Sequence, residues 1–176
     1  IARVTPVIEA VKKEFDIPVS IDTYKSHVAE AAIQAGADLV NDIWGFLYDD
    51  KMAEVVQRYQ AAACLMHNRE QSVYADFLVD MCADLRKCIE KAKAAGIEDD
   101  KIILDPGVGF GKTYEMNLDV MKHLDLFHEL GYPLLLGTSR KSMIGNALNL
   151  PVTEREEGTL VTTVMAVENR YGFVRV

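Results

Sequence analysis

The chain has 176 residues, of which 49% are hydrophobic and 26% are charged, and its formal net charge is -8. This length is enough for one domain with a substantial core. The acidic balance excludes a general surface for nucleic acid or anionic membranes, because such surfaces need an excess of cations. No apolar run approaches the ~18 residues of a membrane span, and the first residues lack the layout of a signal peptide, so cytoplasm is the expected location.

The predicted elements begin with a helix over residues 1–15. Five short apolar runs that lead into polar residues follow, and a sixth reaches the end of the chain. All six are predicted as strands: 19–22, 39–42, 64–67, 102–105, 134–137 and 173–176. The longest helix is expected over 73–95, where apolar residues recur every three or four positions. Thr153 and Glu156 form a capping-box pattern that predicts the start of a last helix, ending near Tyr171.

Glycines stand a few residues before four of the strands, where a left-handed residue commonly ends a helix. These are Gly36, Gly96, Gly131 and Gly172. The three cysteines, Cys64, Cys82 and Cys88, are odd in number and lack Cys-x-x-Cys spacing. We therefore expect reduced, buried thiols rather than a disulfide framework or a zinc site.

Helices between all strands predict parallel strands joined by right-handed crossovers. An open doubly wound sheet and a (β/α)8 barrel both fit, but polar residues at nearly every strand exit favour the barrel. The predicted fold is α/β, a (β/α)8 barrel represented by about six of its eight units, with residues 1–176 as one domain. Because the chain does not begin with methionine and its first helix follows no strand, we expect it to be part of something longer.

The strand ending at Asp105 is followed by a glycine-rich turn, Pro106 to Thr113. A P-loop would need glycine in place of Pro106 and a dinucleotide fingerprint would need it in place of Lys112, so both are rejected. The turn either brings backbone close to a ligand or is merely structural. Asp22 and Asn41 occupy equivalent exits, and three such groups suit a flat heterocycle with donors and acceptors around its edge. Asp105 is the candidate for a paired, charge-assisted contact.

Residues 139–142, Ser-Arg-Lys-Ser, follow what would be the seventh strand of a barrel. Barrels often bind phosphate at the exits of strands seven and eight, and Arg175 lies in the next strand. A lone basic dipeptide is otherwise a surface feature. His67 could contact a ligand or satisfy loop backbone, and both readings stay open. His123 and His128 are five residues apart, so they do not form a facing pair on a helix.

Six segments together resemble dihydropteroate synthase of folate biosynthesis, in the order and spacing of that family: 20–24, 41–45, 66–69, 105–113, 136–142 and 173–176. The resemblance implies a (β/α)8 barrel that joins 4-aminobenzoate to (7,8-dihydropterin-6-yl)methyl diphosphate. The products would be 7,8-dihydropteroate and diphosphate. Sulfonamide drugs act on this family as mimics of 4-aminobenzoate.

By motif position, the resemblance assigns roles to nine residues. The pterin would be held by Asp22, Asn41, Met66, Asp105, Gly137 and Lys141, the aminobenzoate by Phe110, Lys141 and Ser142, and the diphosphate by Arg175. Asp105, Lys141 and Arg175 would be the catalytic residues. If diphosphate leaves first, a pterin-methyl cation forms, which fixed carboxylates would stabilise while cations take up the charge of the leaving group.

The resemblance covers strands three to eight and leaves the domain incomplete at both ends. The family's metal-holding loop lies before the part that matches, so Mg²⁺ is the expected cofactor with no ligand within this chain, and these 176 residues alone should have little or no activity. Partners are expected to be small-molecule substrates and a second copy in a homodimer, with no nucleic acid and no membrane.

Two alternative functions remain. One is the pterin-binding domain of a folate/corrinoid methyltransferase, which has no need of the cations Lys141 and Arg175. The other is a non-catalytic pterin-binding barrel.

Overall fold

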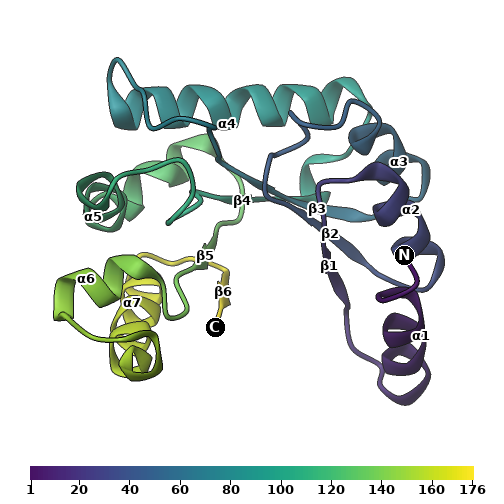
Figure 1. The fold of residues 1–176 in the computed structure, drawn as a ribbon. Helices are drawn as coiled ribbons and strands as arrows, with labels where there is room; N and C mark the ends of the chain where they lie inside the picture. Colours follow the sequence, from purple (N-terminus) through teal and green to yellow (C-terminus); the bar gives the residue numbers. More distant parts are fainter. The chain divides into compact units, whose positions relative to one another are not determined.

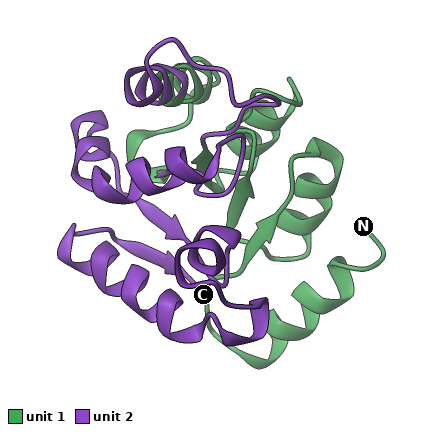
Figure 2. Ribbon diagram, turned by 60° about the vertical axis from the view of Figure 1, so that its left-hand side comes forward, with its two compact units in different colours: residues 1–66, 85–103 green, residues 67–84, 104–176 purple.

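The computed structural model describes residues 1–176, and the chain divides into two units, coloured separately in Figure 2. Unit 1 comprises residues 1–66 and 85–103, and unit 2 comprises residues 67–84 and 104–176. Helices and strands alternate along the chain (Figure 1). All the strand pairs with a recorded register are parallel, as predicted. None of the helices is long and apolar enough to span a membrane.

Unit 1 is built on parallel strands in the order in which they occur in the sequence, and Figure 1 shows β1, β2 and β3 side by side. Its elements are α1 (Thr5–Glu14), β1 (Ser20–Asp22), α2 (Ser26–Gln34), β2 (Leu39–Asp42), α3 (Met52–Arg58), β3 (Ala62–Met66), the later part of α4 (Phe77–Ala94), a 3-10 helix (Asp99–Lys101) and the first half of β4 (Ile102–Asp105). The register places Asp22 beside Asn41, so both side chains leave the sheet at the same level.

The core of unit 1 lies between its strands and helices. Fully buried side chains include Val40 on β2, Leu65 on β3 and Leu85 on α4. Asp38, just before β2, accepts hydrogen bonds from the backbone N–H of Val19 at 2.7 Å and from Lys12 Nζ at 3.0 Å, which ties α1 to the sheet. The three cysteines are free and buried, as expected.

Unit 2 contains the rest of β4 and the C-terminal elements. These are α5 (Tyr114–Lys122), a 3-10 helix (Leu124–Leu130), β5 (Leu135–Gly137), α6 (Ser142–Leu148), a 3-10 helix (Val152–Glu154), α7 (Glu156–Glu168) and β6 (Phe173–Arg175). β5 pairs with β6, and Leu104 of β4 forms a parallel bridge to Leu134. The buried side chains of Leu104, Phe127 and Leu136 form part of its core.

Several predicted elements are confirmed, with shifted boundaries. The strands at 39–42 and 102–105 occur as predicted, whereas β3 begins at Ala62, two residues early, because Ala62 and Ala63 pair with Leu39 and Val40 despite their small side chains. α4 begins only at Phe77. The residues before it form a loop whose Val73 carbonyl accepts a hydrogen bond from Arg69 Nη1.

Two predicted boundary signals are wrong. Thr153 lies in a 3-10 helix, and α7 begins at Glu156 with no side-chain cap and ends at Glu168. Gly36, Gly96 and Gly131 have the predicted positive φ, of 110°, 89° and 81°. Gly172 does not, because the left-handed residue after α7 is Arg170, with a φ of 56°. The chain therefore leaves the helix two residues before the glycine.

Candidate functional site

Asp105 is the buried carboxylate at the end of β4 in unit 2. Its side chain is almost inaccessible, and Oδ1 accepts a hydrogen bond from the backbone N–H of Gly107 at 2.7 Å. Burial raises the pKa of Asp105, and the Gly107 N–H and the cations Lys141, Arg175 and Lys112 oppose that shift. The carboxylate is thus buried within a cluster of positive charges.

The glycine-rich loop after Asp105, residues 107–111, is held mainly by side chains. Lys112 Nζ donates to Gly107 O and Phe110 O, and Lys141 Nζ donates to Val108 O. The Gly109 N–H donates to Asn117 Oδ1, and the Tyr74 hydroxyl donates to Gly111 O. α5 follows directly, with Thr113 as its N-cap accepting from the backbone N–H of Met116 at 3.3 Å. These bonds fix the conformation of the loop that carries Phe110.

Gly111 has a steric reason to be glycine, which gives a first prediction. Its φ is +55°, and an added Cβ would stand 2.4 Å from the carbonyl oxygen of Arg69. We expect Gly111→Ala to lower the free energy of unfolding by about 2 to 4 kcal/mol, through strain and overlap. Gly131→Ala is the matched control, because φ is +81° there but nothing lies within 4 Å, so the loss should be about 1 kcal/mol. Equal losses in urea denaturation would contradict the steric account.

Lys141 stands at the N-cap of α6 and reaches back to the glycine-rich loop. Its Nζ donates to Val108 O and lies 4.5 Å from the centre of the Phe110 ring. Burial lowers the pKa of Lys141 to about 8, with Asp105 favouring the charged amine and Arg175 disfavouring it. Lys141 is therefore a cation at neutral pH, placed beside an aromatic wall.

Arg175 and Gly137 are paired partners in the β5–β6 register. A Cβ on Gly137 would lie 2.8 Å from Arg175 Nη2, so the missing side chain lets the guanidinium lie against β5. The positive charge of Arg175 also lowers the pKa of Lys141. The sequence-predicted residues Asp105, Lys141, Arg175, Gly137 and Phe110 thus gather in unit 2.

The loop between β5 and α6 is held by α7. Thr138 Oγ1 bonds Thr162 Oγ1 at 2.8 Å, and the backbone N–H of Arg140 donates to Thr159 Oγ1 at 2.9 Å. Ser142 is the exposed first residue of α6. α7 therefore fixes the segment that presents Lys141 and Ser142.

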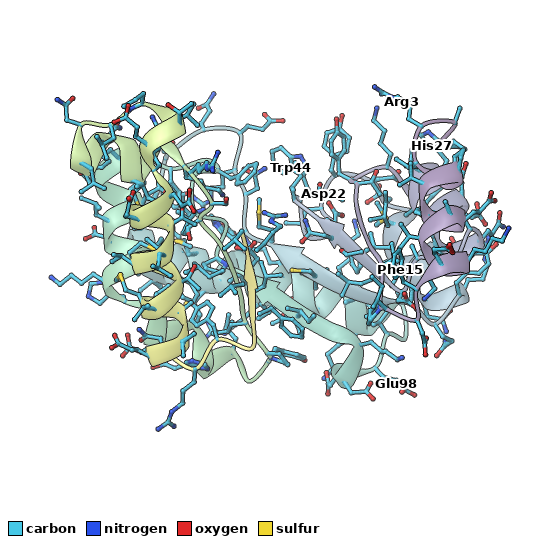
Figure 3. All side chains as sticks on the ribbon, turned by 90° about the horizontal axis from the view of Figure 1, so that it is seen from below. Arg3, Phe15, Asp22, His27, Trp44 and Glu98 are labelled. Atoms are coloured by element: carbon cyan, nitrogen blue, oxygen red, sulfur yellow. The ribbon has the colours of Figure 1, made fainter.

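In unit 1, Asp22 and Asn41 form a hydrogen-bonded pair. Asn41 Nδ2 donates to Asp22 Oδ2 at 3.0 Å, with Asn41 buried and Asp22 exposed. Figure 3 shows Asp22 and Trp44 at one end of this unit and Glu98 at the other. Met66 ends β3 and is fully buried. The pair lies at the carboxyl end of the parallel strands β1 and β2.

Asp42 has a structural role that the sequence did not assign. It is fully buried, and its two oxygens accept from the backbone N–H groups of Trp44 at 2.9 Å and Phe46 at 3.0 Å. Burial raises the pKa of Asp42, and these two N–H groups oppose the shift. Asp42 thereby orders the loop after β2.

The structure gives His67 a lysine partner. Lys112 Nζ lies 2.9 Å from His67 Nδ1, and Nε2 lies 3.5 Å from Asp84 Oδ2 without a hydrogen-bond partner. Burial, followed by the charge of Lys112, lowers the pKa of His67 to about 3. His67 is therefore neutral, with Nδ1 as acceptor and the proton on Nε2. The sequence drew attention to His67 but not to Lys112.

The neutral state of His67 leads to a second prediction, on stability. Between pH 6.5, its ordinary pKa, and about 3, the unfolded chain binds a proton that the folded chain does not. The contribution of His67 to the free energy of unfolding should thus fall as the pH decreases, by about 1.4 kcal/mol per pH unit. We expect His67→Gln to lose less stability on acidification from about pH 6 to about pH 5, measured by urea denaturation. Parallel stability curves would contradict the assignment.

The other two histidines of unit 2, His123 and His128, contact backbone carbonyl groups. His123 Nδ1 lies 2.9 Å from Asp119 O, and His128 Nε2 lies 2.6 Å from Asn169 O. No group of three His, Cys, Asp or Glu side chains in residues 1–176 is arranged to hold a metal ion.

The comparisons with known proteins agree with one another. The family model described as "Pterin binding enzyme" matches residues 1–176. A curated dihydropteroate synthase from Clostridium beijerinckii is 60% identical over 177 residues, covering 100% of this chain and 66% of that protein. The chain therefore spans slightly less than two thirds of that relative.

Solved structures are similar over nearly the whole chain. The dihydropteroate synthase from Clostridium difficile, determined in the presence of pteroic acid, has a TM-score of 0.97 and 46% identity, covering 99% of this chain and 67% of that one. The Yersinia pestis enzyme in a sulfonamide drug complex has a TM-score of 0.94 and 37% identity, and the match covers 99% of this chain and 66% of that one. This likeness confirms the predicted fold, an α/β chain that represents part of a (β/α)8 barrel.

Proposed function

The chain belongs to the pterin-binding enzyme family, and we propose that it supplies most of the active site of a dihydropteroate synthase. The reaction would condense (7,8-dihydropterin-6-yl)methyl diphosphate with 4-aminobenzoate, giving 7,8-dihydropteroate and diphosphate. Residues 1–176 would be part of one pterin-binding domain. By analogy with the drug complex of the Yersinia pestis relative, sulfonamides would compete with 4-aminobenzoate.

The observation that carries this proposal is the charge cluster in unit 2. A buried carboxylate, Asp105, lies under the influence of two cations that the sequence places on different segments, Lys141 and Arg175. A carboxylate is suited to bind two adjacent N–H groups of a pterin ring. The cations are suited to an anionic leaving group, because fixed charges stabilise the charge that develops as the bond breaks.

The proposed roles follow those groups. Asp105 would anchor the pterin edge and stabilise a pterin-methyl cation, with Asp22, Asn41, Met66 and Gly137 as further pterin contacts. Lys141 would lie between the two substrates, and Arg175 would bind the diphosphate. Phe110 and Ser142 would lie towards the aminobenzoate. The amine of 4-aminobenzoate is a neutral nucleophile, so the site needs no strong base.

A methyltransferase domain that binds a methylated pterin is the second candidate. Such a domain has no diphosphate to neutralise. The presence of two cations, Lys141 and Arg175, that act on Asp105 therefore disfavours this candidate. A non-catalytic barrel would retain the pterin contacts without turnover. An assay that measures dihydropteroate and diphosphate separates both from the synthase.

The remaining assignments rest on the family resemblance. Magnesium is the proposed cofactor, with ligands from a family loop outside residues 1–176. We also propose a homodimer in the cytoplasm, with small molecules as the other partners and no nucleic acid or membrane.

The deciding experiment is a synthase assay on a full-length protein that carries these residues. Purified protein is mixed with the dihydropterin diphosphate, 4-aminobenzoate and Mg²⁺, and 7,8-dihydropteroate and diphosphate are measured. Release of both in equal amounts supports the proposal. Methyl transfer to a corrinoid without dihydropteroate would favour the methyltransferase, and pterin binding without either product would favour the non-catalytic barrel.

A further inference from the structure

Two lysines hold the glycine-rich loop, and they do so differently. Lys112 Nζ contacts Gly107 O, Phe110 O and His67 Nδ1, each at 2.9 Å. Burial lowers the pKa of Lys112 to about 7. In its protonated form the side chain has three N–H donors, and these three acceptors use all of them. Lys141 Nζ donates to Val108 O, and it also faces the ring of Phe110. Lys112 therefore has no donor left for a ligand, whereas Lys141 has.

Lys112 donates hydrogen bonds to two carbonyl groups of the same turn. The backbone N–H of Phe110 donates to Gly107 O at 3.1 Å, which closes a turn. In that turn the carbonyls of Gly107 and Phe110 both approach the Lys112 ammonium. Partly buried carbonyls need donors, and two carbonyl dipoles brought together are favourable only when a cation or donor lies between them.

The groups around Lys112, above all His67, hold its side chain in one position. His67 is fully buried, and its backbone N–H donates to Asp105 O at 2.9 Å, so its backbone is attached to the end of β4. Farther along the loop, the Tyr74 hydroxyl donates to Gly111 O at 2.7 Å. The loop is thus held on the His67 side by hydrogen bonds that do not involve Lys141.

We propose that Lys112 is a positioning residue for 4-aminobenzoate: it keeps Phe110 in place when Lys141 leaves the loop to bind substrate. The inference rests on the proposed function, in which Phe110 and Lys141 face the aminobenzoate. Lys112 acts through Phe110 and touches no substrate itself. Its loss should therefore weaken the use of 4-aminobenzoate far more than that of the pterin substrate.

The kinetic test uses a full-length protein that carries these residues, with Lys112→Met and the exposed control Lys122→Met. For Lys112→Met we expect the KM for 4-aminobenzoate to rise about tenfold, while kcat and the Kd of the dihydropterin diphosphate change by less than about threefold. The control should leave all three unchanged. An unchanged KM in Lys112→Met, or an equal rise in the pterin Kd, would overturn the proposal.

A double-mutant cycle separates positioning from general destabilisation. If Lys112 acts through Phe110, then Lys112→Met should not raise the KM further in a Phe110→Ala background, because the ring it positions is absent. A merely structural loss would add to the effect of Phe110→Ala. Additive effects on the KM would therefore count against the proposal.

Amide hydrogen exchange tests the same inference without activity. In Lys112→Met the amides of Gly109 and Phe110 should exchange about tenfold faster, while that of Leu104 in β4 keeps its protection. Unchanged exchange in the loop would refute the positioning role. If the unaltered protein makes no dihydropteroate, the proposed function fails, but this measurement still decides whether Lys112 holds the loop.

A second variant covers the case in which Lys112→Met does not fold. Lys112→Arg keeps the charge but replaces three converging donors with a planar fork, which cannot reach the same carbonyls in the same way. We expect it to fold and to raise the KM for 4-aminobenzoate in the same direction. A normal KM and normal loop exchange in this variant would overturn the proposal.

Discussion

Replacing Asp105 with asparagine is expected to weaken binding of the dihydropterin diphosphate by about 1.5 to 3 kcal/mol, roughly 10- to 150-fold. The amide would still accept a hydrogen bond, but it would carry no charge for the N–H groups of a pterin. It would also leave Lys141, Arg175 and Lys112 without the carboxylate that compensates them. The loss should therefore appear in binding and in kcat/KM together.

Isothermal calorimetry with a full-length protein measures this effect directly. Asp119→Asn is the matched control, because Asp119 is an exposed carboxylate of α5 in the same unit. A thermal unfolding curve of each variant separates weaker binding from a loss of folded protein. Unchanged affinity in Asp105→Asn would remove Asp105 from the proposed pterin site.

Asp105 was predictable from the sequence for a physical reason. A short apolar run that ends in a carboxylate marks a strand exit, and the strands at 39–42 and 102–105 occur as that pattern indicates. The family resemblance then supplied the other roles. Parallel register also explains why Asp22 and Asn41 meet, since equivalent exits of neighbouring strands lie at the same level.

The role of Lys112 could not be predicted from sequence patterns. In the sequence it excludes a dinucleotide fingerprint and lies in the segment 105–113 that resembles the family, but nothing there indicates that the loop folds back so that two carbonyls face its ammonium. Its third partner, His67, is forty-five positions away. The late start of α4 has a similar cause, since Arg69 binds the Val73 carbonyl and Asp84 and thereby competes with helix formation.

The second large effect is expected for Lys141→Gln, which should lower kcat/KM for both substrates by about 100-fold or more. Glutamine is shorter and uncharged, so it would lose the contact with Val108 O and the position beside the Phe110 ring. It would also remove the positive charge that balances Asp105. Steady-state kinetics in which each substrate is varied in turn would measure the loss, with Lys122→Gln as the exposed control.

The pH profile identifies the charge of Lys141 as the cause. Because its pKa is lowered to about 8, the amine is protonated below that pH and neutral above it. For the unaltered protein, kcat/KM should therefore fall as the pH rises through about 8. Lys141→Gln has no such group, so its low activity should not show this decrease. A decrease at the same pH in the variant would assign the titration to another residue, and normal constants for both substrates would contradict the proposed role of Lys141.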